Sequence, residues 1–395
     1  MTSPDVIIIG GGPAGLAASI GCAGHGLRIL VVERQAFPVD KACGEGLLPN
    51  AVATLGRLGV SVDALASGAR TIAGIRYLTQ RGTIAEGTFI GQMGLGLRRS
   101  DLSRVLVDHA RGLPGVEIVN GEVATADVDD AGTPIVHVGG TTYRPKLLIG
   151  ADGLHSRTRA VTRIPVAHHG SRRWGCRQHF ATDPWTDRVE VYFGPGFEVY
   201  VTPVGGGLNV AALWDAQAVR WRTGSSPVEE AVAAVPVLAE RLNGVPPADR
   251  AKAGGPFDVR IARPWRAGVL LLGDAAGYVD ALTGEGVGLA LEQGMLLAST
   301  VVPALRQTAA GDVAVVDVLA RYSRAARRRA RANRQLTRVL VQLARYPAVV
   351  ERVVGLLASR PALLAHLLEV NMGRRELWQL PIPRATWRGL AAAKE

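Results

Sequence analysis

The chain has 395 residues, of which 48% are apolar and 20% charged, and its 45 lysines and arginines exceed its 34 acidic residues by 11. This composition is typical of a globular protein with a large core and excludes a disordered or fibrous chain. Cys22, Cys43 and Cys176 are far apart and form no C-x-x-C pair, which argues against a disulfide scaffold, a zinc ribbon and a dithiol redox centre. We expect no metal site and a cytoplasmic location.

No apolar run approaches the roughly 18 residues needed to span a bilayer. The first run, Val6 to Ile9, is too short for the core of a signal peptide. Much of the positive charge lies in one helix-like block, residues 324–334, which contains no interleaved aromatic residues. This pattern favours a solvated helix face over nucleic-acid binding. Peripheral contact with anionic lipids stays open.

The N-terminal segment reads as a β-α-β unit. A buried strand at 5–9 is followed by Gly10-x-Gly12-x-x-Gly15, a helix to about residue 24 and a second strand at 28–33. The glycines permit a tight turn, an approach of backbone N–H groups to a pyrophosphate and close packing of helix on strand. Glu33, at the end of the second strand, is placed to bind a ribose. The unit predicts dinucleotide binding.

The rest of the chain alternates between two kinds of pattern. Helices are expected at 50–58 and 101–111, a strand at 116–119, a strand pair at 122–138, a buried strand at 269–272 and a helix after 286. Residues 71–93 show short strands and turns, and 174–214 alternate as an antiparallel sheet, with strands at 189–193 and 197–201. Beyond 321 the chain reads as helices, two of them starting at Pro347 and Pro361. One apolar face is expected from Leu336, Val339, Leu340 and Leu343, and the pattern repeats at Leu363, Leu364, Leu367 and Leu368.

These patterns predict an α/β protein with a discontinuous, Rossmann-like nucleotide domain formed by 1–70, 97–165 and 264–320. An inserted antiparallel β-sheet domain, 71–96 and 166–263, is expected to bind substrate. The C-terminal helical region, 321–395, is expected to pack over the nucleotide domain. The alternative is that it lies on an anionic membrane.

Two further motifs indicate which dinucleotide is bound. Residues 150–159 match G-A-D-G-x-x-S-x-x-R, and Gly273-Asp274 follows a buried strand. With the N-terminal fingerprint, this ordered trio resembles the FAD-dependent para-hydroxybenzoate-hydroxylase-like superfamily over about residues 5–295. Residues 38–47, with K-x-C-G, and 273–286 look most like its geranylgeranyl-reductase-like branch. The Tyr200–Pro203 segment looks closer to bacterial hydroxylases of that branch.

The resemblance implies that FAD is the bound nucleotide. Asp274 would accept hydrogen bonds from the ribityl chain, and Arg99, in R-x-x-L, would face the nucleotide, although a solvated arginine at a helix start would look the same. The full set of expected FAD contacts is Gly10, Gly12, Pro13, Ala14, Gly15, Glu33, Arg34, Lys41, Arg99, Asp152, Gly153, Gly273, Asp274, Gly286 and Val287.

Four residues are expected near the flavin ring: Cys43, Gly284, Glu285 and Gly286. Free N–H groups at the start of the helix after Gly286 could stabilise negative charge on the reduced ring. The alternative for Cys43 is a structural role, as a small buried residue in a glycine-rich loop. A plain glycine turn is the alternative for the Gly284–Gly286 segment.

Candidate substrate contacts lie on the inserted strands: Arg177, His179, Tyr192 and Tyr200. Alternation places half of any strand away from a pocket, so each of these side chains could instead be structural.

The resemblance implies an FAD-dependent monooxygenase reduced by NADPH or NADH, which hydroxylates a hydrophobic aromatic or phenolic compound, polyketide-derived ones included, through a flavin C4a-hydroperoxide formed with O₂. The alternative is an FAD-dependent reductase of prenyl or other isolated double bonds. A non-catalytic, basic nucleic-acid-binding protein is a third reading, against which the three flavin motifs speak. The motifs do not determine the substrate or the oligomeric state.

Overall fold

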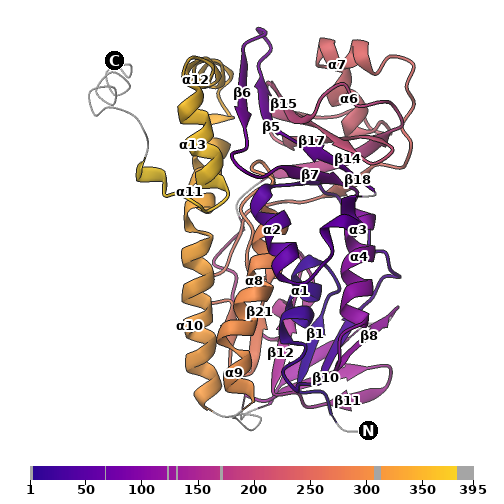
Figure 1. Cartoon of the computed structure of the whole chain (residues 1–395), viewed down its shortest axis with the longest axis vertical. Helices are drawn as coiled ribbons and strands as arrows, with labels where there is room; N and C mark the ends of the chain where they lie inside the picture. Colours follow the sequence, from indigo (N-terminus) through magenta and orange to yellow (C-terminus); the bar gives the residue numbers. More distant parts are fainter. Residues whose placement is uncertain are drawn as a thin grey trace.

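The computed structural model describes residues 3–66, 68–121, 124–129, 132–169, 172–306 and 313–379. The molecule is elongated, with a parallel sheet in one half, a larger sheet in the other half and the C-terminal helices along one side (Figure 1). The N-terminus lies at the end of the molecule that is far from the larger sheet.

The parallel sheet carries the predicted nucleotide fold. Its strand order is β20-β21-β12-β1-β2-β8, and every neighbouring pair is parallel except β20–β21. Buried apolar residues on both faces of the central strands explain why these runs are continuous and not alternating. The strands are β1 (Val6–Ile9), β2 (Ile29–Glu33), β8 (Val116–Asn120), β12 (Leu147–Gly150), β20 (Trp265–Arg266) and β21 (Val269–Leu271).

Helices pack around this sheet, and two three-stranded sheets are separate from it. The helices are α1 (Pro13–Cys22), α2 (Pro49–Arg57), α3 (Val62–Ala66), α4 (Arg99–Arg111), α5 (Arg157–Val161), α8 (Gly286–Thr300) and α9 (Val302–Leu305), with the 3-10 turn η1 (Gly273–Ala276). One three-stranded sheet holds β3 (Gly46–Leu47), β7 (Gly94–Leu97) and β4 (Ala69–Ile72), and another holds β9 (Thr125–Val128), β10 (Pro134–Val138) and β11 (Thr141–Tyr143).

Most expected elements near this sheet are confirmed within one to three residues. The expected strand pair at 122–138 corresponds to β9 and β10, although residues 122–123 and 130–131 lie outside the described residues. The third strand, β11, was not predicted, because only three residues follow the Gly139-Gly140 turn before the chain leaves the sheet.

The larger sheet has seven strands in the order β18-β14-β17-β16-β15-β5-β6. It was expected to be antiparallel, but β5 pairs with β15 in parallel, so the sheet is mixed. The parallel pair arises because β5 comes from a segment about 110 residues earlier, and a parallel neighbour needs such a crossover connection. The strands are β5 (Gly74–Leu78), β6 (Ile84–Thr88), β14 (Arg173–Phe180), β15 (Arg188–Gly194), β16 (Phe197–Val204), β17 (Gly207–Asp215) and β18 (Lys252–Gly254).

Two short helices, α6 (Pro227–Ala233) and α7 (Pro236–Arg241), cover one face of the larger sheet. Their apolar residues, among them Val228 and Leu238, form a core cluster with Phe197 and Val199 of β16. A separate two-stranded sheet is formed by β13 (His168–His169) and β19 (Val259–Arg260). Along the chain, each of these strands falls between a strand of the parallel sheet and a strand of the larger sheet. The opposite face of the larger sheet therefore points toward the nucleotide domain and the C-terminal helices.

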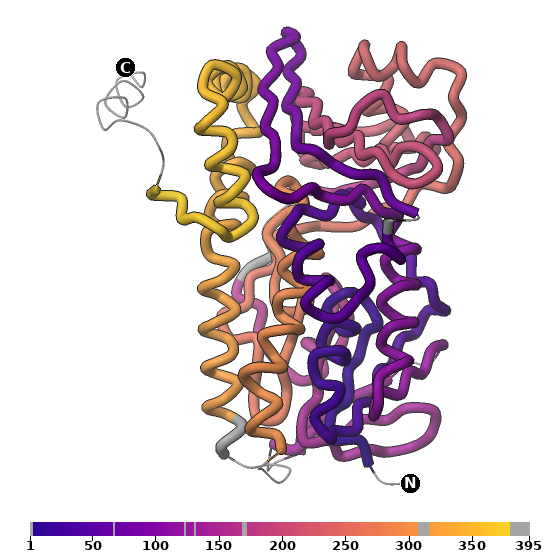
Figure 2. The backbone as a smooth tube through the Cα atoms, in the orientation of Figure 1, coloured from indigo at the N-terminus to yellow at the C-terminus, as the bar shows by residue number. Residues whose placement is uncertain are grey.

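The C-terminal helices are α10 (Val313–Arg329), α11 (Arg331–Leu343), α12 (Pro347–Ser359) and α13 (Pro361–Asn371), followed by the turn η2 (Leu377–Gln379). The tube in Figure 2 shows α10 and α11 running beside α8 up to the larger sheet. Leu319 and Tyr322 of α10 are buried in the core of the nucleotide domain, so this region packs on the protein.

The helices start at Pro347 and Pro361 as expected. Val339 was expected to share the inward face of Leu336, but it is 47% exposed. In the described part of the chain no single helix is long and apolar enough to cross a membrane, and α12 and α13 would reach that length only as a pair bent by 108°.

Candidate functional site

The turn between β1 and α1 is tightly packed. Gly10 has φ +111°, and a Cβ there would overlap the carbonyl of Ala151. A Cβ on Gly15 would overlap the carbonyl of Gly10. Only glycine allows the backbone conformation at the first position and the close approach at the second. The two glycines bring the start of α1, with its free N–H groups, to the carboxyl end of the parallel sheet.

Gly12 is different, because its surroundings are open. Its φ of −76° suits any residue, and a Cβ there would meet only the Nη2 atom of Arg99, at 3.8 Å. The Arg99 side chain is 6% exposed, and its Nη1 atom has no hydrogen-bond partner among the described residues. A buried guanidinium facing free helix N–H groups across open space suits a pyrophosphate. The residues present therefore fit the phosphates of a dinucleotide.

Glu33 lies at the end of β2 and is 3% exposed. Its carboxylate accepts hydrogen bonds from the backbone N–H groups of Gly11, at 2.7 Å, and Gln35, at 3.0 Å. These bonds hold the acid beside the glycine turn, where its remaining lone pairs can accept from a ribose. Arg34, next in the chain, is exposed.

Charged groups from three segments converge beyond this turn. Burial lowers the pKa of Lys41, while the nearby carboxylates of Glu33 and Asp274 raise it and Arg99 lowers it. Burial raises the pKa of Asp274, opposed by Lys41 and Arg99. Asp274 is the second residue of the η1 turn that follows β21. The structure thus brings together four of the expected FAD contacts, from Glu33 to Asp274, which come from three separate segments of the chain.

Hydrogen bonds hold the G-A-D-G-x-x-S-x-x-R motif together and connect it to the η1 turn. The Asp152 carboxylate accepts hydrogen bonds from Ser156 Oγ, at 2.5 Å, and from the N–H of Thr158, at 2.9 Å, so its side chain caps the start of α5. Arg159 donates from Nη1 to the carbonyl of Ala275, in η1, and from Nη2 to that of Leu154. Ser156 and Arg159 belong to the motif, but the sequence did not show that they tie its turn to η1.

The K-x-C-G loop joins the nucleotide site to the larger sheet. Burial raises the pKa of the Cys43 thiol, and the carbonyl of Cys43 accepts from Asn209 Nδ2 at 3.0 Å. Glu45 is buried with φ +61°. One of its carboxylate oxygens accepts from the N–H of Arg99, at 2.8 Å, and the other lies 2.7 Å from His179 Nε2. Glu45 was not among the expected site residues.

Two of the expected substrate contacts take part in this connection. Arg177 pairs with Asp40, at 2.5 Å, and with Asp249. His179 pairs with Asp249 at 2.8 Å and with Glu45. Burial lowers the pKa of His179, but the hydrogen bonds to both carboxylates raise it above its ordinary value of 6.5. Both side chains lie on the face of β14 that points to the nucleotide domain, and both already have partners within the chain.

The two expected tyrosine contacts lie on opposite faces of the larger sheet. Tyr200 donates a hydrogen bond to the carbonyl of Leu282, at 2.9 Å, in the loop before α8. Tyr192 packs in the cluster under α6 and α7, and its hydroxyl donates to Glu190 at 2.7 Å. Tyr192 is a neighbour of Val199 in the sheet register, whereas Tyr200 is a neighbour of Val191. The structure therefore does not bring Tyr192 together with the other candidates.

An apolar pocket lies where β5, β15, the loop before α8 and helices α11 to α13 meet. It holds about 720 Å³ of space free of atoms, its mouth included. Tyr77 and Phe193, whose rings stack with centroids 6.1 Å apart, line it on the sheet side. Leucines and valines of the three helices line the other side, among them Leu340 and Leu364. None of the four expected substrate contacts belongs to this lining.

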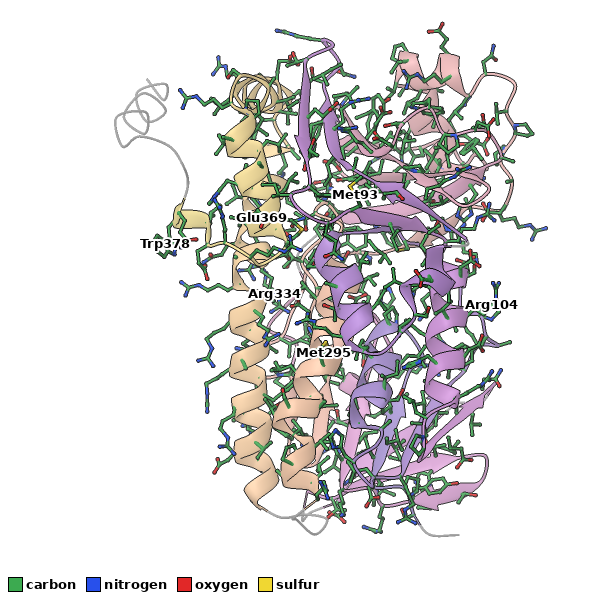
Figure 3. The ribbon with its side chains drawn as sticks, in the orientation of Figure 1. Met93, Arg104, Met295, Arg334, Glu369 and Trp378 are labelled. Atoms are coloured by element: carbon green, nitrogen blue, oxygen red, sulfur yellow. The ribbon has the colours of Figure 1, made fainter. Side chains whose placement is uncertain are left out.

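The pocket has one polar end, at Thr283 and Asn371. Asn371 Nδ2 donates to the carbonyl of Thr283 at 2.9 Å, and the hydroxyls of Thr283 and Thr337 lie 3.0 Å apart. A second, more polar cavity adjoins this end and is lined by Asp274, Tyr278, Gln293 and Arg334, among others. Figure 3 labels Arg334 on the inner side of α11.

In the chain, the segment expected near the flavin ring directly follows two residues that line the pocket. Leu282 and Thr283 line the pocket, Gly284 has φ +68°, and α8 begins at Gly286. Glu285 precedes α8 and is 2% exposed; its side chain turns inward to Asn50 of α2. Burial raises the pKa of Glu285 to about 8. Backbone N–H groups of the first turn of α8, and not this carboxyl, are available to a flavin ring.

These features fit a protein that binds a dinucleotide through its β1-α1 turn and has an apolar pocket near that site. Residues 3–337 match the family described as "FAD binding domain", so the chain belongs to this family. The protein is an FAD-dependent oxidoreductase, and the three-motif resemblance is confirmed.

Named relatives carry different activities. The menaquinone reductase of Mycobacterium tuberculosis (strain ATCC 25618 / H37Rv) is 29% identical, over 75% of this chain and 76% of its own. The 6-methylpretetramide 4-monooxygenase of Streptomyces rimosus is 27% identical, over 94% and 93%. The structure of pqsL, a probable FAD-dependent monooxygenase from Pseudomonas aeruginosa, superposes with a TM-score of 0.73 at 21% identity, over 89% of this chain and 99% of that one. This last likeness concerns the fold.

Proposed function

We propose that the protein is an NAD(P)H-using monooxygenase that hydroxylates a hydrophobic aromatic or phenolic molecule, and that this molecule occupies the apolar pocket. The observation that carries the proposal is continuity: the pocket residues Leu282 and Thr283 lead without a break into Gly284 and the start of α8. FAD, when bound, supplies electrons from the nicotinamide reductant and, with O₂, the oxygen that is transferred.

The chain's own contribution is positioning and shielding. The leucines and valines of α11 to α13 form an apolar wall of the pocket, which limits the access of water to the oxygen-transfer step. Tyr77 and Phe193 offer aromatic surface to a ring. The carbonyl and hydroxyl of Thr283 and the amide of Asn371 can orient one polar group of the substrate at the end nearest α8.

The division of the chain follows from these roles. We assign the nucleotide domain to 1–70, 97–165 and 264–320, and the substrate-binding sheet to 71–96 and 166–263. The C-terminal region, 321–395, supplies the second wall of the pocket through α11 to α13; residues 380–395 lie outside the described residues. In this assignment Arg177 and His179 hold the sheet to the K-x-C-G loop, and only Tyr200 reaches the pocket margin.

A reductase of prenyl or other isolated double bonds is the second candidate. It is favoured by the aliphatic lining contributed by α11 to α13, which suits a branched hydrocarbon chain as well as a ring. It is also favoured by the similarity to the menaquinone reductase of Mycobacterium tuberculosis.

Paired measurements of NADPH and O₂ consumption separate the two candidates. The purified flavoprotein is mixed with each member of a panel of phenolic compounds and prenyl lipids, and the product masses are measured by mass spectrometry. Hydroxylation predicts O₂ uptake that depends on a phenolic compound and a product heavier by one oxygen. A product heavier by two hydrogens per double bond, formed without O₂, would replace hydroxylation with reduction.

A further inference from the structure

A buried acid–amide pair lies immediately before α8. Glu285 precedes the helix, and its carboxyl oxygen Oε1 accepts a hydrogen bond from Asn50 Nδ2 of α2. Glu285 is 2% exposed and Asn50 is 7% exposed. The carboxyl folds back over its own helix and lies so close to Gly288 that a Cβ on this glycine would overlap it. The pair is therefore held in place by two helices and is shielded from solvent.

Each partner has one unsatisfied atom. Glu285 Oε2 and Asn50 Oδ1 are both buried, and neither has a hydrogen-bond partner among the described residues. Both atoms are acceptors when the carboxyl is ionised, so they cannot satisfy each other. One proton on the carboxyl turns Oε2 into a donor, so that its O–H can satisfy the amide oxygen while the amide N–H donates to Oε1.

We propose that Glu285 carries a proton in the folded protein and, paired with Asn50, keeps the first turn of α8 free of negative charge. The N–H groups of that turn then present their full positive potential to the reduced, anionic flavin. Glu285 is in this sense a positioning residue that acts through the helix. The protonation is inferred from the two unsatisfied atoms of the pair, whereas its effect on flavin rests on the ring position assumed in the proposed function.

The charged surroundings agree with a neutral Glu285. Burial is the main cause that raises its pKa to about 8; Glu292 on α8 raises it further, while the hydrogen bond from Asn50 and the charge of Arg374 lower it. Burial likewise raises the pKa of Glu292, opposed by Arg329 and Arg57 and by a hydrogen bond from Asn50. Two acids share one amide in a buried place, so at least one of them is best accommodated as the neutral acid.

Glu285→Gln tests the protonation in the apoprotein. Glutamine keeps both hydrogen bonds to Asn50 and cannot ionise. If Glu285 is protonated in the folded state and ionised in the unfolded state, rising pH favours the unfolded wild type. Between pH ~5 and ~8 the folded-to-unfolded ratio of the wild type should then fall, relative to that of E285Q, about tenfold per pH unit. Urea unfolding at several pH values measures this ratio, with Glu292→Gln as the matched control. Parallel pH dependences of the wild type and E285Q would overturn the protonation.

Two further measurements complete the test. An infrared carboxylic-acid band at neutral pH in the wild type and in E292Q is expected, and its absence would overturn the proposal even if E285Q did not fold. In the FAD-loaded protein, the flavin midpoint potential of the wild type should fall more steeply above pH ~8 than that of E285Q. If the stability result holds but the potentials remain parallel, the ring position in the proposed function is wrong and Glu285 is only a buried acid.

Discussion

The nucleotide site and the apolar pocket adjoin each other but are built in different ways. The nucleotide site depends on backbone atoms within a few residues of Gly10, Gly12 and Gly15, with Arg99 and Asp274 brought to it. The pocket is made almost entirely of side chains, from two sheet strands, one loop and three helices near the C-terminus. The first can therefore be recognised from a short motif, whereas the second changes with every lining residue and can differ between relatives that share the fold.

Gly12→Val should damage the nucleotide site alone and have the largest effect. The protein has room for a Cβ at this position, because the nearest atom beyond the adjoining residues is Arg99 Nη2 at 3.8 Å, but the same space is where a pyrophosphate would lie. We expect the dissociation constant of FAD to rise at least about 100-fold, or roughly 3 kcal/mol. Flavin fluorescence titration measures it, and Gly355→Val on α12, where a Cβ also has space, serves as the control. Full flavin occupancy of G12V would refute the phosphate cradle.

Arg99→Leu should weaken the same site less. The substitution removes a buried guanidinium with an unpaired Nη1 atom, and hydrogen bonds to charged groups contribute about 1.5–3 kcal/mol. The FAD dissociation constant should therefore rise roughly 10- to 100-fold. The neighbouring Arg98 is the matched control, since its Nε atom donates to the Gly205 carbonyl on another side. Equal losses in R98L and R99L would mean that charge in general, and not this contact, binds FAD.

Leu340→Trp should affect the pocket and spare the nucleotide. Leu340 lines the pocket, whereas Val339, its neighbour on α11, is 47% exposed. An indole at 340 would occupy space that the substrate needs, so substrate-dependent NADPH oxidation should fall at least about tenfold with unchanged FAD content. V339W should retain both properties. Activity in L340W equal to that in V339W would place the substrate elsewhere.

His179→Gln should have the smallest effect, at the connection between the two regions. The pKa of His179 is raised in the folded protein, so the wild type gains stability from the charged imidazole below about pH 6.5 and loses it as pH rises through the folded pKa. The stability of the wild type relative to H179Q should therefore decline from pH 6 to pH 9, by about the 1 kcal/mol of one hydrogen bond. Urea unfolding at both pH values measures this, and a constant difference would show that His179 stays neutral.

Sequence patterns predicted local features best. The β-α-β unit, the strand before Gly273 and the helix starts at Pro347 and Pro361 were found because each depends on contiguous residues. The parallel β5–β15 pair was missed because it joins segments about 110 residues apart. Arg177 and His179 were chosen from strand position alone, and their actual partners, Asp40, Asp249 and Glu45, come from loops that no local pattern connects to them. Tyr192 was chosen in the same way, and its partner, Glu190, lies two residues away on the same strand.

The pocket illustrates the same limit. The leucine spacing around 336–343 and 363–368 predicted helices with an apolar face, but a spacing pattern does not say what that face covers. In the structure it covers the side of the larger sheet that carries Tyr77 and Phe193 and meets the loop before α8. Much of the excess positive charge lies in residues 324–334, on α10 and the start of α11, where Arg324, Arg328 and Arg331 are exposed.

The sequence by itself therefore determined the cofactor class and the nucleotide fold, because a glycine turn that binds phosphate works through its own backbone and must appear as contiguous residues. Only the tertiary structure decided where an apolar pocket forms and which acids and bases are buried beside one another. Those properties depend on which distant side chains exclude water from one another, and neither burial nor a cavity is a property of any single segment of the chain.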